Sequence, residues 1–176
     1  MFLTPAERAA GQIAKRAPKL ADRAGKVWAA PNTAIGLAYG ALGHAAGTVA
    51  HAIDSRLPRP RVRRGENSVD FINNPFGGVG AVTLGNSVTY RGDPYDLDDK
   101  FWGGGGPEAR RHELQHTIQS QQLGPLYLPS NALGGLTALI LDRDRKGQPD
   151  WHGDHNWNEQ GPMGDPARPW PPRKSP

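Results

Sequence analysis

The sequence His112-Glu113-Leu114-Gln115-His116 constrains this chain more than any other feature. It has the form H-E-x-x-H. On a helix, residues four apart are neighbours about 6 Å along the axis, so the imidazoles of His112 and His116 could bind one zinc ion. Glu113 would lie beside that face, where its carboxylate could hold a water molecule and accept its proton. The pattern therefore predicts metal-assisted hydrolysis, most often of a peptide bond.

The residues around this motif predict the helix that it needs. A glycine run from Gly103 to Gly106 is followed by Pro107, a residue favoured at the first helical position. Neither glycine nor proline occurs from Arg110 to Leu123, and Gly124-Pro125 provides a stop. The helix would be polar for a buried one, so we expect a ligand or a cleft to hold it in place.

A catalytic zinc site usually has three protein ligands and one open position, so the two histidines need a third partner. The chain contains no cysteine, which leaves histidine, aspartate or glutamate. The densest group of candidates is the segment 151–159. Glu159 would complete a set of two histidines and a glutamate, His155 would complete a three-histidine set, and Asp154 is a further alternative. The same segment could instead be an exposed polar loop.

Two other side chains are candidates for stabilising a developing oxyanion. His152 belongs to the same segment, and Tyr127 follows the motif helix. Either could donate a hydrogen bond to the negatively charged oxygen of a tetrahedral intermediate.

The remaining pattern predicts further strands and helices. Ser68 to Ile72 reads as a short strand, and Ala81 to Tyr90 alternates between apolar and polar residues, as in a half-buried strand with a bulge near Gly85-Asn86. Ser130 could cap a second helix from Asn131 to Leu141.

The segment from Ala34 to Ile53 carries no formal charge. Its length fits a membrane span, but alanine and glycine dominate it and His44 and His51 interrupt it. Two small-xxx-small spacings, Gly36/Gly40 and Gly43/Gly47, allow close approach of a helix to its neighbours. We therefore favour a soluble helix or helical pair packed on the domain over membrane association.

Arginines are concentrated between Arg56 and Arg64, where Pro58 and Pro60 interrupt them. Such a cluster could bind nucleic acid or anionic lipid. We interpret it as a solvated, extended linker, since the prolines prevent a helix. No aromatic side chain nearby could stack on bases, so no nucleic-acid partner is expected.

The motif resembles that of the zincin metallopeptidases, and a glutamate beyond a second helix is similar to their gluzincin branch. Much of residues 30–160 also resembles a group of small bacterial proteins, some of them linked to polymorphic toxins or secreted effectors. The resemblance implies a zincin-like fold, with His112, His116 and Glu159 as ligands and Glu113 as the base. The chain departs from the gluzincin pattern at Gln115, where a small residue is usual, and lacks the aspartate that follows the third ligand. The similar stretches are Asn32-Thr33-Ala34-Ile35-Gly36, Asn74-Pro75-Phe76-Gly77, Thr83-Leu84-Gly85-Asn86, His112 to Gln119, Leu123 to Pro129 and Trp157-Asn158-Glu159.

We accordingly expect an α+β fold: a small zincin-like domain with a short antiparallel sheet, the motif helix and a following helix. An Ala/Gly-rich helical segment would precede it. The expected organisation is a helical segment at 1–57, an Arg/Pro-rich linker at 58–67, the metal-binding domain at 68–160 and an irregular Pro-rich tail at 161–176.

The expected function is that of a zinc-dependent hydrolase, most readily a metallopeptidase acting on a protein or peptide. The resemblance extends this to a bacterial effector or toxin domain, with a cognate partner or a secretion component. Residues 1–26 show no secretory signal, so we expect synthesis in the bacterial cytoplasm and export by a specialised system. A non-catalytic, metal-stabilised binding module and a membrane-directed effector are the alternatives.

Overall fold

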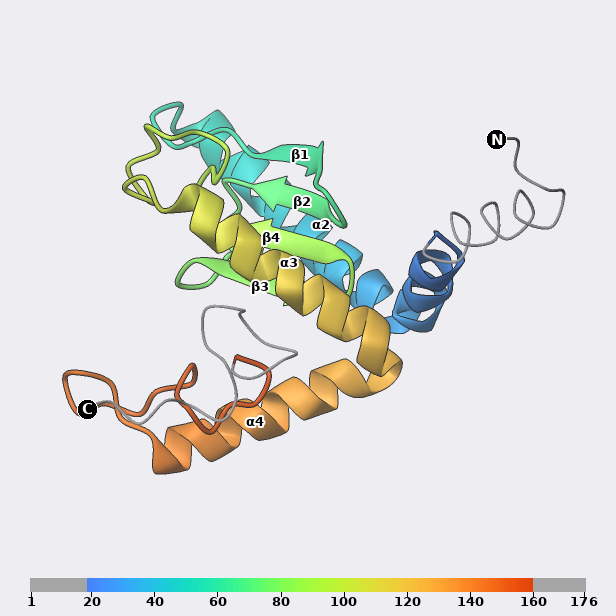
Figure 1. The fold of residues 1–176 in the computed structure, drawn as a ribbon. Coiled ribbons are helices and arrows are strands. Elements are labelled where there is room, and N and C mark those ends of the chain that lie inside the picture. Colours follow the sequence, from blue (N-terminus) through green and yellow to red (C-terminus); the bar gives the residue numbers. More distant parts are fainter. Residues whose placement is uncertain (1–18, 160–176) are drawn as a thin grey trace, which may run out of the picture.

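A four-stranded sheet with helices against both of its faces forms the centre of this protein (Figure 1). The computed structural model describes residues 19–159, and residues 19–28 are helical up to a turn at Ala29. The fold is α+β, as the sequence predicts. The other elements are the helices α2 (Ala30–Ile53), α3 (Gly106–Leu123) and α4 (Tyr127–Leu141), the 3-10 turn η1 (Gly124–Leu126), and the strands β1 (Arg61–Arg64), β2 (Val69–Ile72), β3 (Ala81–Leu84) and β4 (Ser87–Tyr90).

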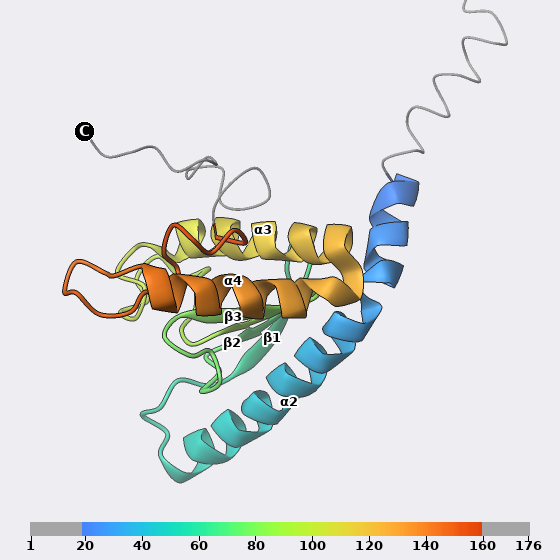
Figure 2. The same cartoon turned by 90° about the horizontal axis from the view of Figure 1, so that it is seen from below.

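The strands are arranged in the order β1-β2-β4-β3. β1 pairs with β2 and β3 pairs with β4 in antiparallel fashion, whereas β2 and β4 are parallel. The sheet is therefore mixed, where the sequence predicts an antiparallel one. α2 covers one face, and α3 covers the other with α4 beside it (Figure 2). β3 is an edge strand on the side of the sheet nearest to α4.

Glycines bring α2 close to the sheet. Gly36, Gly40, Gly43 and Gly47 are all buried, and their spacing puts them on one face of the helix. A Cβ atom at Gly40 would overlap the ring of Phe71 in β2. The predicted helix packed on the domain is thus present as one continuous element. In residues 19–159, the helices are too short or too polar to cross a membrane.

The stretch from Ala81 to Tyr90 is a hairpin, so the prediction of a single bulged strand is wrong. β3 and β4 pair with each other, and Gly85 and Asn86 form the loop between them. Gly85 has a φ of 66°, in the left-handed region that glycine adopts without strain, which suits a two-residue hairpin loop. The alternation of apolar and polar residues continues through the turn, so the sequence pattern does not indicate where β3 ends and β4 begins.

Part of the predicted Arg/Pro-rich linker is a strand. Residues 61–64 form β1 at the edge of the sheet opposite β3. Pro60 disfavours a helix but permits an extended chain. Two arginines of this strand then contact side chains of the loop that follows β4. Arg61 pairs with the buried carboxylate of Asp93, and the guanidinium of Arg63 lies 3.8 Å from the ring centroid of Tyr95.

α3 begins and ends where the sequence predicts. Proline lies in its first turn, and it ends at Gly124, whose φ is 57°. α4 starts at Tyr127, four residues before the predicted Asn131, so Ser130 lies inside the helix and does not cap it. The Ser130 hydroxyl instead accepts a hydrogen bond of 2.9 Å from the indole of Trp157. The predicted tail at 161–176 and the helical pattern before residue 19 lie outside the described residues.

Candidate metal centre

The buried face of α3 is polar. Apart from Gly106, its buried residues are Glu113, His116, Thr117, Gln119 and Ser120. A helix with this composition gains little from apolar burial, so its position depends on how these polar groups are satisfied. Their partners come from β3, from the N-terminal end of α2 and from the segment 151–159.

His112 and His116 direct the same ring nitrogen towards one point. Their Nε2 atoms are 3.0 Å apart, and the rings lie nearly perpendicular with centroids 4.6 Å apart. His116 is buried, whereas the side chain of His112 is 30 % exposed. The helical spacing of four residues is what brings the two rings together.

Glu159 is the acidic residue that the fold brings to these histidines. Its Oε2 lies 3.2 Å from Nε2 of His112, and its Oε1 lies 3.4 Å from Nε2 of His116. Ligand atoms of the three residues all lie within 4.8 Å of one another. Donors about 2.0–2.1 Å from a tetrahedral ion would be separated by about 3.3 Å, so the group has the dimensions of a metal site. Within residues 19–159, no other group of three or more His, Asp or Glu side chains meets this criterion.

The ionisation of this cluster follows from its burial and its contacts. Burial raises the pKa of the Glu159 carboxyl, but hydrogen bonds from His112, His116 and His152 outweigh it and hold that pKa well below the usual range. Burial lowers the pKa of His116, but the hydrogen bond and charge of Glu159 and the charge of Glu113 raise it to about 9. A buried anion therefore faces histidines that can donate to it. A divalent cation bound between these side chains would balance the negative charge of the Glu159 carboxylate, as the histidine protons do in its absence.

Gln119 connects the histidines of α3 with the segment that carries Glu159. Its side chain is 1 % exposed. Its Oε1 accepts a 2.9 Å hydrogen bond from Nδ1 of His116, and its amide donates a 2.6 Å bond to the carbonyl of Asn158. One side chain thus orients a histidine on α3 and anchors the backbone next to Glu159.

The segment that carries Glu159 is held by buried asparagines. Asn156 is fully buried, its amide donates to the carbonyl of Trp151, and its Oδ1 accepts from the backbone of Asn158. A Cβ atom at Gly134 of α4 would collide with the Asn156 side chain, so a glycine there is required for the close approach. The irregular segment is therefore fixed by specific bonds and not by regular secondary structure.

Glu113 lies next to the cluster and is held from the sheet. Its side chain is buried, and the hydroxyl of Thr83 in β3 donates a 2.5 Å hydrogen bond to its Oε2. Tyr127 is also buried, with its ring centroid 6.4 Å from that of His116. Burial, with the charges of Glu113 and Glu159, raises the pKa of the Tyr127 hydroxyl.

A cleft of about 430 Å³ opens onto these residues. The β3 edge strand and the loop before it form one wall, and the first turns of α4 form the other. His152 lines the cleft with a 56 % exposed side chain, and its Nδ1 is 3.5 Å from Oε1 of Glu159. The cleft therefore gives incoming molecules access to the His112, His116 and Glu159 cluster, to Glu113 and to His152.

The structure separates the other candidate ligands from the cluster. The Nδ1 of His155 lies 2.6 Å from Oδ1 of Asp142, and the His155 backbone also donates to Asp142. His155 is therefore engaged with Asp142 and lies outside the cluster. Asp154 is exposed and is not part of the group.

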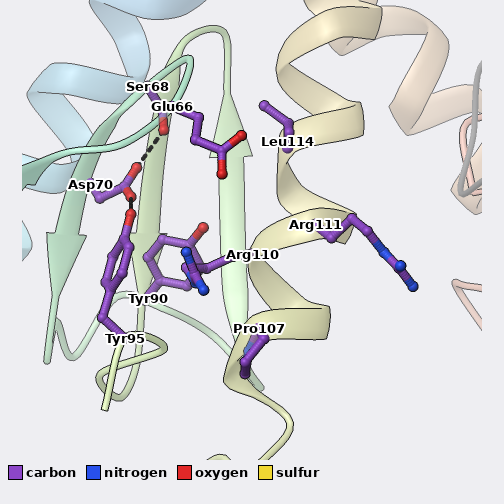
Figure 3. Close-up of a pocket in the computed structure, with 9 residues that line it drawn as sticks. All are labelled: Glu66, Ser68, Asp70, Tyr90, Tyr95, Pro107, Arg110, Arg111 and Leu114. Carbon is purple, nitrogen blue, oxygen red and sulfur yellow. Dashed lines mark hydrogen bonds between the residues drawn. The ribbon is translucent and has the colours of Figure 1, made fainter. Parts of the chain in front are cut away.

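A second cavity, of about 310 Å³, lies on the sheet side of α3 near its first turns (Figure 3). Some of its polar groups bond to one another, whereas the buried Nε of Arg110 has no hydrogen-bond partner. The buried carboxylate of Asp70 accepts hydrogen bonds from Ser68 and Tyr95, and the guanidinium of Arg110 lies 4.5 Å from the Tyr95 ring centroid. This cavity contains none of the residues that the sequence predicts for a site.

Sequence reasoning missed Thr83 and Gln119. Gln119 lies three residues after His116 on the same helical face, so the spacing alone could have identified it. Thr83 is 30 residues from Glu113, and only the tertiary structure brings the two together. Comparisons of the chain with protein-family models, with curated proteins and with solved structures found no match.

Proposed function

We propose that this protein is a zinc-dependent hydrolase that cleaves peptide bonds, with Glu113 as the general base. The observation that carries the proposal is the convergence of His112, His116 and Glu159 beside Glu113 at the floor of a cleft. These residues come from α3 and from a segment about 40 residues later, so helical spacing alone does not account for their meeting.

Zinc is the metal that this donor set fits best. Two imidazoles and one carboxylate are a ligand combination of catalytic zinc sites, and the separations of 3.0, 3.2 and 3.4 Å suit a tetrahedral ion. Among residues 19–159, the cluster has three members and no fourth His, Asp or Glu. A set of three protein ligands leaves one position for water or substrate, which favours catalysis over a purely structural site.

Zinc bound there would lower the pKa of a water molecule and polarise the substrate carbonyl. Glu113 would accept the proton of that water and later deliver it to the departing amine nitrogen. The hydrogen bond from Thr83 to its Oε2 would hold the carboxylate in place for this transfer. Both His152 and Tyr127 line the cleft, and His152, the more exposed of the two, is the group that we assign as donor to the oxyanion.

The cleft supports an extended peptide as the substrate. β3 is an edge strand and lines the cleft, so its outer side can form backbone hydrogen bonds with an added strand. Apart from the site residues, the cleft is lined mainly by apolar side chains, such as Val79, Val82 and Leu128. We expect uncharged side chains at the substrate positions that contact these walls.

The resemblance to toxin-associated bacterial proteins extends the proposal. On that resemblance, the hydrolase would be an effector or toxin domain, made in the bacterial cytoplasm and exported by a specialised system. A cognate partner or secretion component would then bind it before export.

Cleavage of a mixed library of unstructured peptides by the zinc-loaded chain tests the proposal. Glu113→Gln should retain zinc and lose at least about 100-fold in cleavage rate, the contribution typical of a general base. His155→Ala is the matched control and should cleave as the parent does. If Glu113→Gln cleaves as fast as the parent, the assignment of the base is wrong. If the parent binds zinc and cleaves nothing in the library, the alternative of a metal-stabilised binding module is favoured.

A further inference from the structure

The face of α2 that points away from the sheet is mainly apolar, with Thr48 as an exposed polar residue at its border, and the helix is about 36 Å long for its 24 residues. Four large side chains recur along it and are more than half exposed: Ile35 (53 %), Leu42 (66 %), Val49 (61 %) and Ile53 (83 %). Exposed alanines lie beside and between them. They are Ala34, Ala38, Ala41, Ala45, Ala46 and Ala52. A continuous apolar surface of this kind marks an interaction site, whereas single exposed apolar side chains do not.

Charge is absent from this helix and concentrated at its two ends. The sequence from Ala30 to Ile53 contains no Asp, Glu, Lys or Arg. The helical residues 19–28 before it carry three exposed cations and one carboxylate, and Arg56 and Arg59 after it are exposed beside a single aspartate. The apolar face is thus bordered by net positive charge on both sides.

A groove of about 740 Å³ adjoins the same face. It lies between α2 and β1, and Ala34 belongs to both the groove and the exposed face. Leu37 and Val62 give it an apolar lining, and Lys26 and Arg64 add positive charge, with Glu66 as the one carboxylate among the residues that line it. An acyl chain with an anionic headgroup would be complementary to this lining, since the chain fits the apolar side chains and the headgroup the cations.

We propose that α2 docks the protein on an anionic lipid bilayer, with the helix lying in the plane of the interface. Its glycine face stays packed on the sheet, so only the outer side chains enter the membrane, to the depth of about 5–10 Å typical of interfacial helices. The flanking lysines and arginines contact the headgroups. A second copy of the chain fits less well, because parallel and antiparallel pairs of α2 would both bring cations against cations.

Co-flotation of the full chain with vesicles tests this docking surface independently of any hydrolytic activity. Vesicles of phosphatidylcholine with a quarter of phosphatidylglycerol should bind at least about tenfold more protein than phosphatidylcholine alone, and high salt should reduce the difference. The double variant Leu42→Gln/Val49→Gln should lower binding at least about tenfold, since it removes two inserted apolar side chains. The matched control is Leu133→Gln/Ile140→Gln on α4, whose side chains are 59 % and 71 % exposed and which should bind as the parent does.

Arg56→Gln/Arg59→Gln provides a second test that leaves the helix unchanged. Each lost arginine should weaken binding to the anionic vesicles about fivefold. Equal binding to both vesicle types would overturn the proposal, as would equal loss in the α2 and α4 variants. Light scattering that shows a dimer of the parent, converted to a monomer by Leu42→Gln/Val49→Gln, would assign the face to a second copy instead.

Discussion

Gln119 fixes the ring of His116 by accepting a hydrogen bond from its Nδ1, which leaves Nε2 directed at the cluster. Its amide group holds the backbone carbonyl of Asn158, next to Glu159. Partners of this kind around metal ligands set the tautomer and orientation of the histidine.

Replacing Gln119 should therefore weaken metal binding without removing a ligand. Gln119→Leu should lower zinc affinity by about 10–100-fold, as loss of such partners typically does. Competition with a chromogenic chelator measures the affinity. Gln122→Leu, an exposed change on the same helix, is the control. Unchanged affinity in Gln119→Leu would show that the hydrogen bonds to His116 and Asn158 do not support the site.

Thr83 should affect the reaction rate and not the metal. Thr83→Val removes the hydrogen bond that holds Oε2 of Glu113, so we expect intact zinc affinity and a loss of roughly tenfold in cleavage rate. Thr48→Val removes a hydroxyl that bonds within α2 and should have no effect on either quantity. A large loss of zinc in Thr83→Val would place its role in folding or metal binding.

The metal-free protein should lose stability as the pH rises. His116 has a pKa of about 9, above its ordinary value of 6.5, so it takes up a proton on folding near neutral pH. Its contribution to the free energy of unfolding is complete below pH 6.5 and disappears as the pH rises through 9. Thermal unfolding of the chelator-treated chain across this range should show a falling midpoint. His116→Ala should flatten the profile, and an equally steep fall in that variant would assign the effect to another group.

The glycine face of α2 should tolerate no side chain. Gly40→Val would push a branched side chain into Phe71 and should lower the free energy of unfolding by at least about 2 kcal/mol. Ala41→Val places the same side chain on the exposed neighbouring position and should cost less than about 1 kcal/mol. Denaturant titration measures both, and equal effects would contradict the packing of α2 on the sheet.

The presence of the helices could be predicted from the sequence, and the ends of α3 as well because they carry local signals, whereas the predicted start of α4 lies four residues too late. Pro107 and Gly124 bracket α3, and the uncharged Ala34–Ile53 stretch lies within α2. The parallel pairing of β2 with β4 could not be predicted, since it joins segments that are not adjacent in the chain. The hairpin at Gly85 was hidden because the polarity alternation continues across its two-residue loop.

Part of the candidate site could be predicted because local spacing along a helix can be read from the sequence. His112, Glu113 and His116 belong to one helix, where spacing determines which side chains meet. The choice among Asp154, His155 and Glu159 depends on the path of an irregular segment. Hydrogen bonds from Gln119 and from buried asparagines determine that path, and no periodic pattern encodes it.

Zinc stoichiometry of the purified full chain and its variants measures directly whether His112, His116 and Glu159 bind one metal ion. Elemental analysis after equilibrium dialysis against zinc should give about one ion per chain for the parent and for His155→Ala, as expected for one three-ligand site. Glu159→Ala and His112→Ala should retain little or none. Full retention of zinc in Glu159→Ala, or its loss in His155→Ala, would contradict the assignment of this centre.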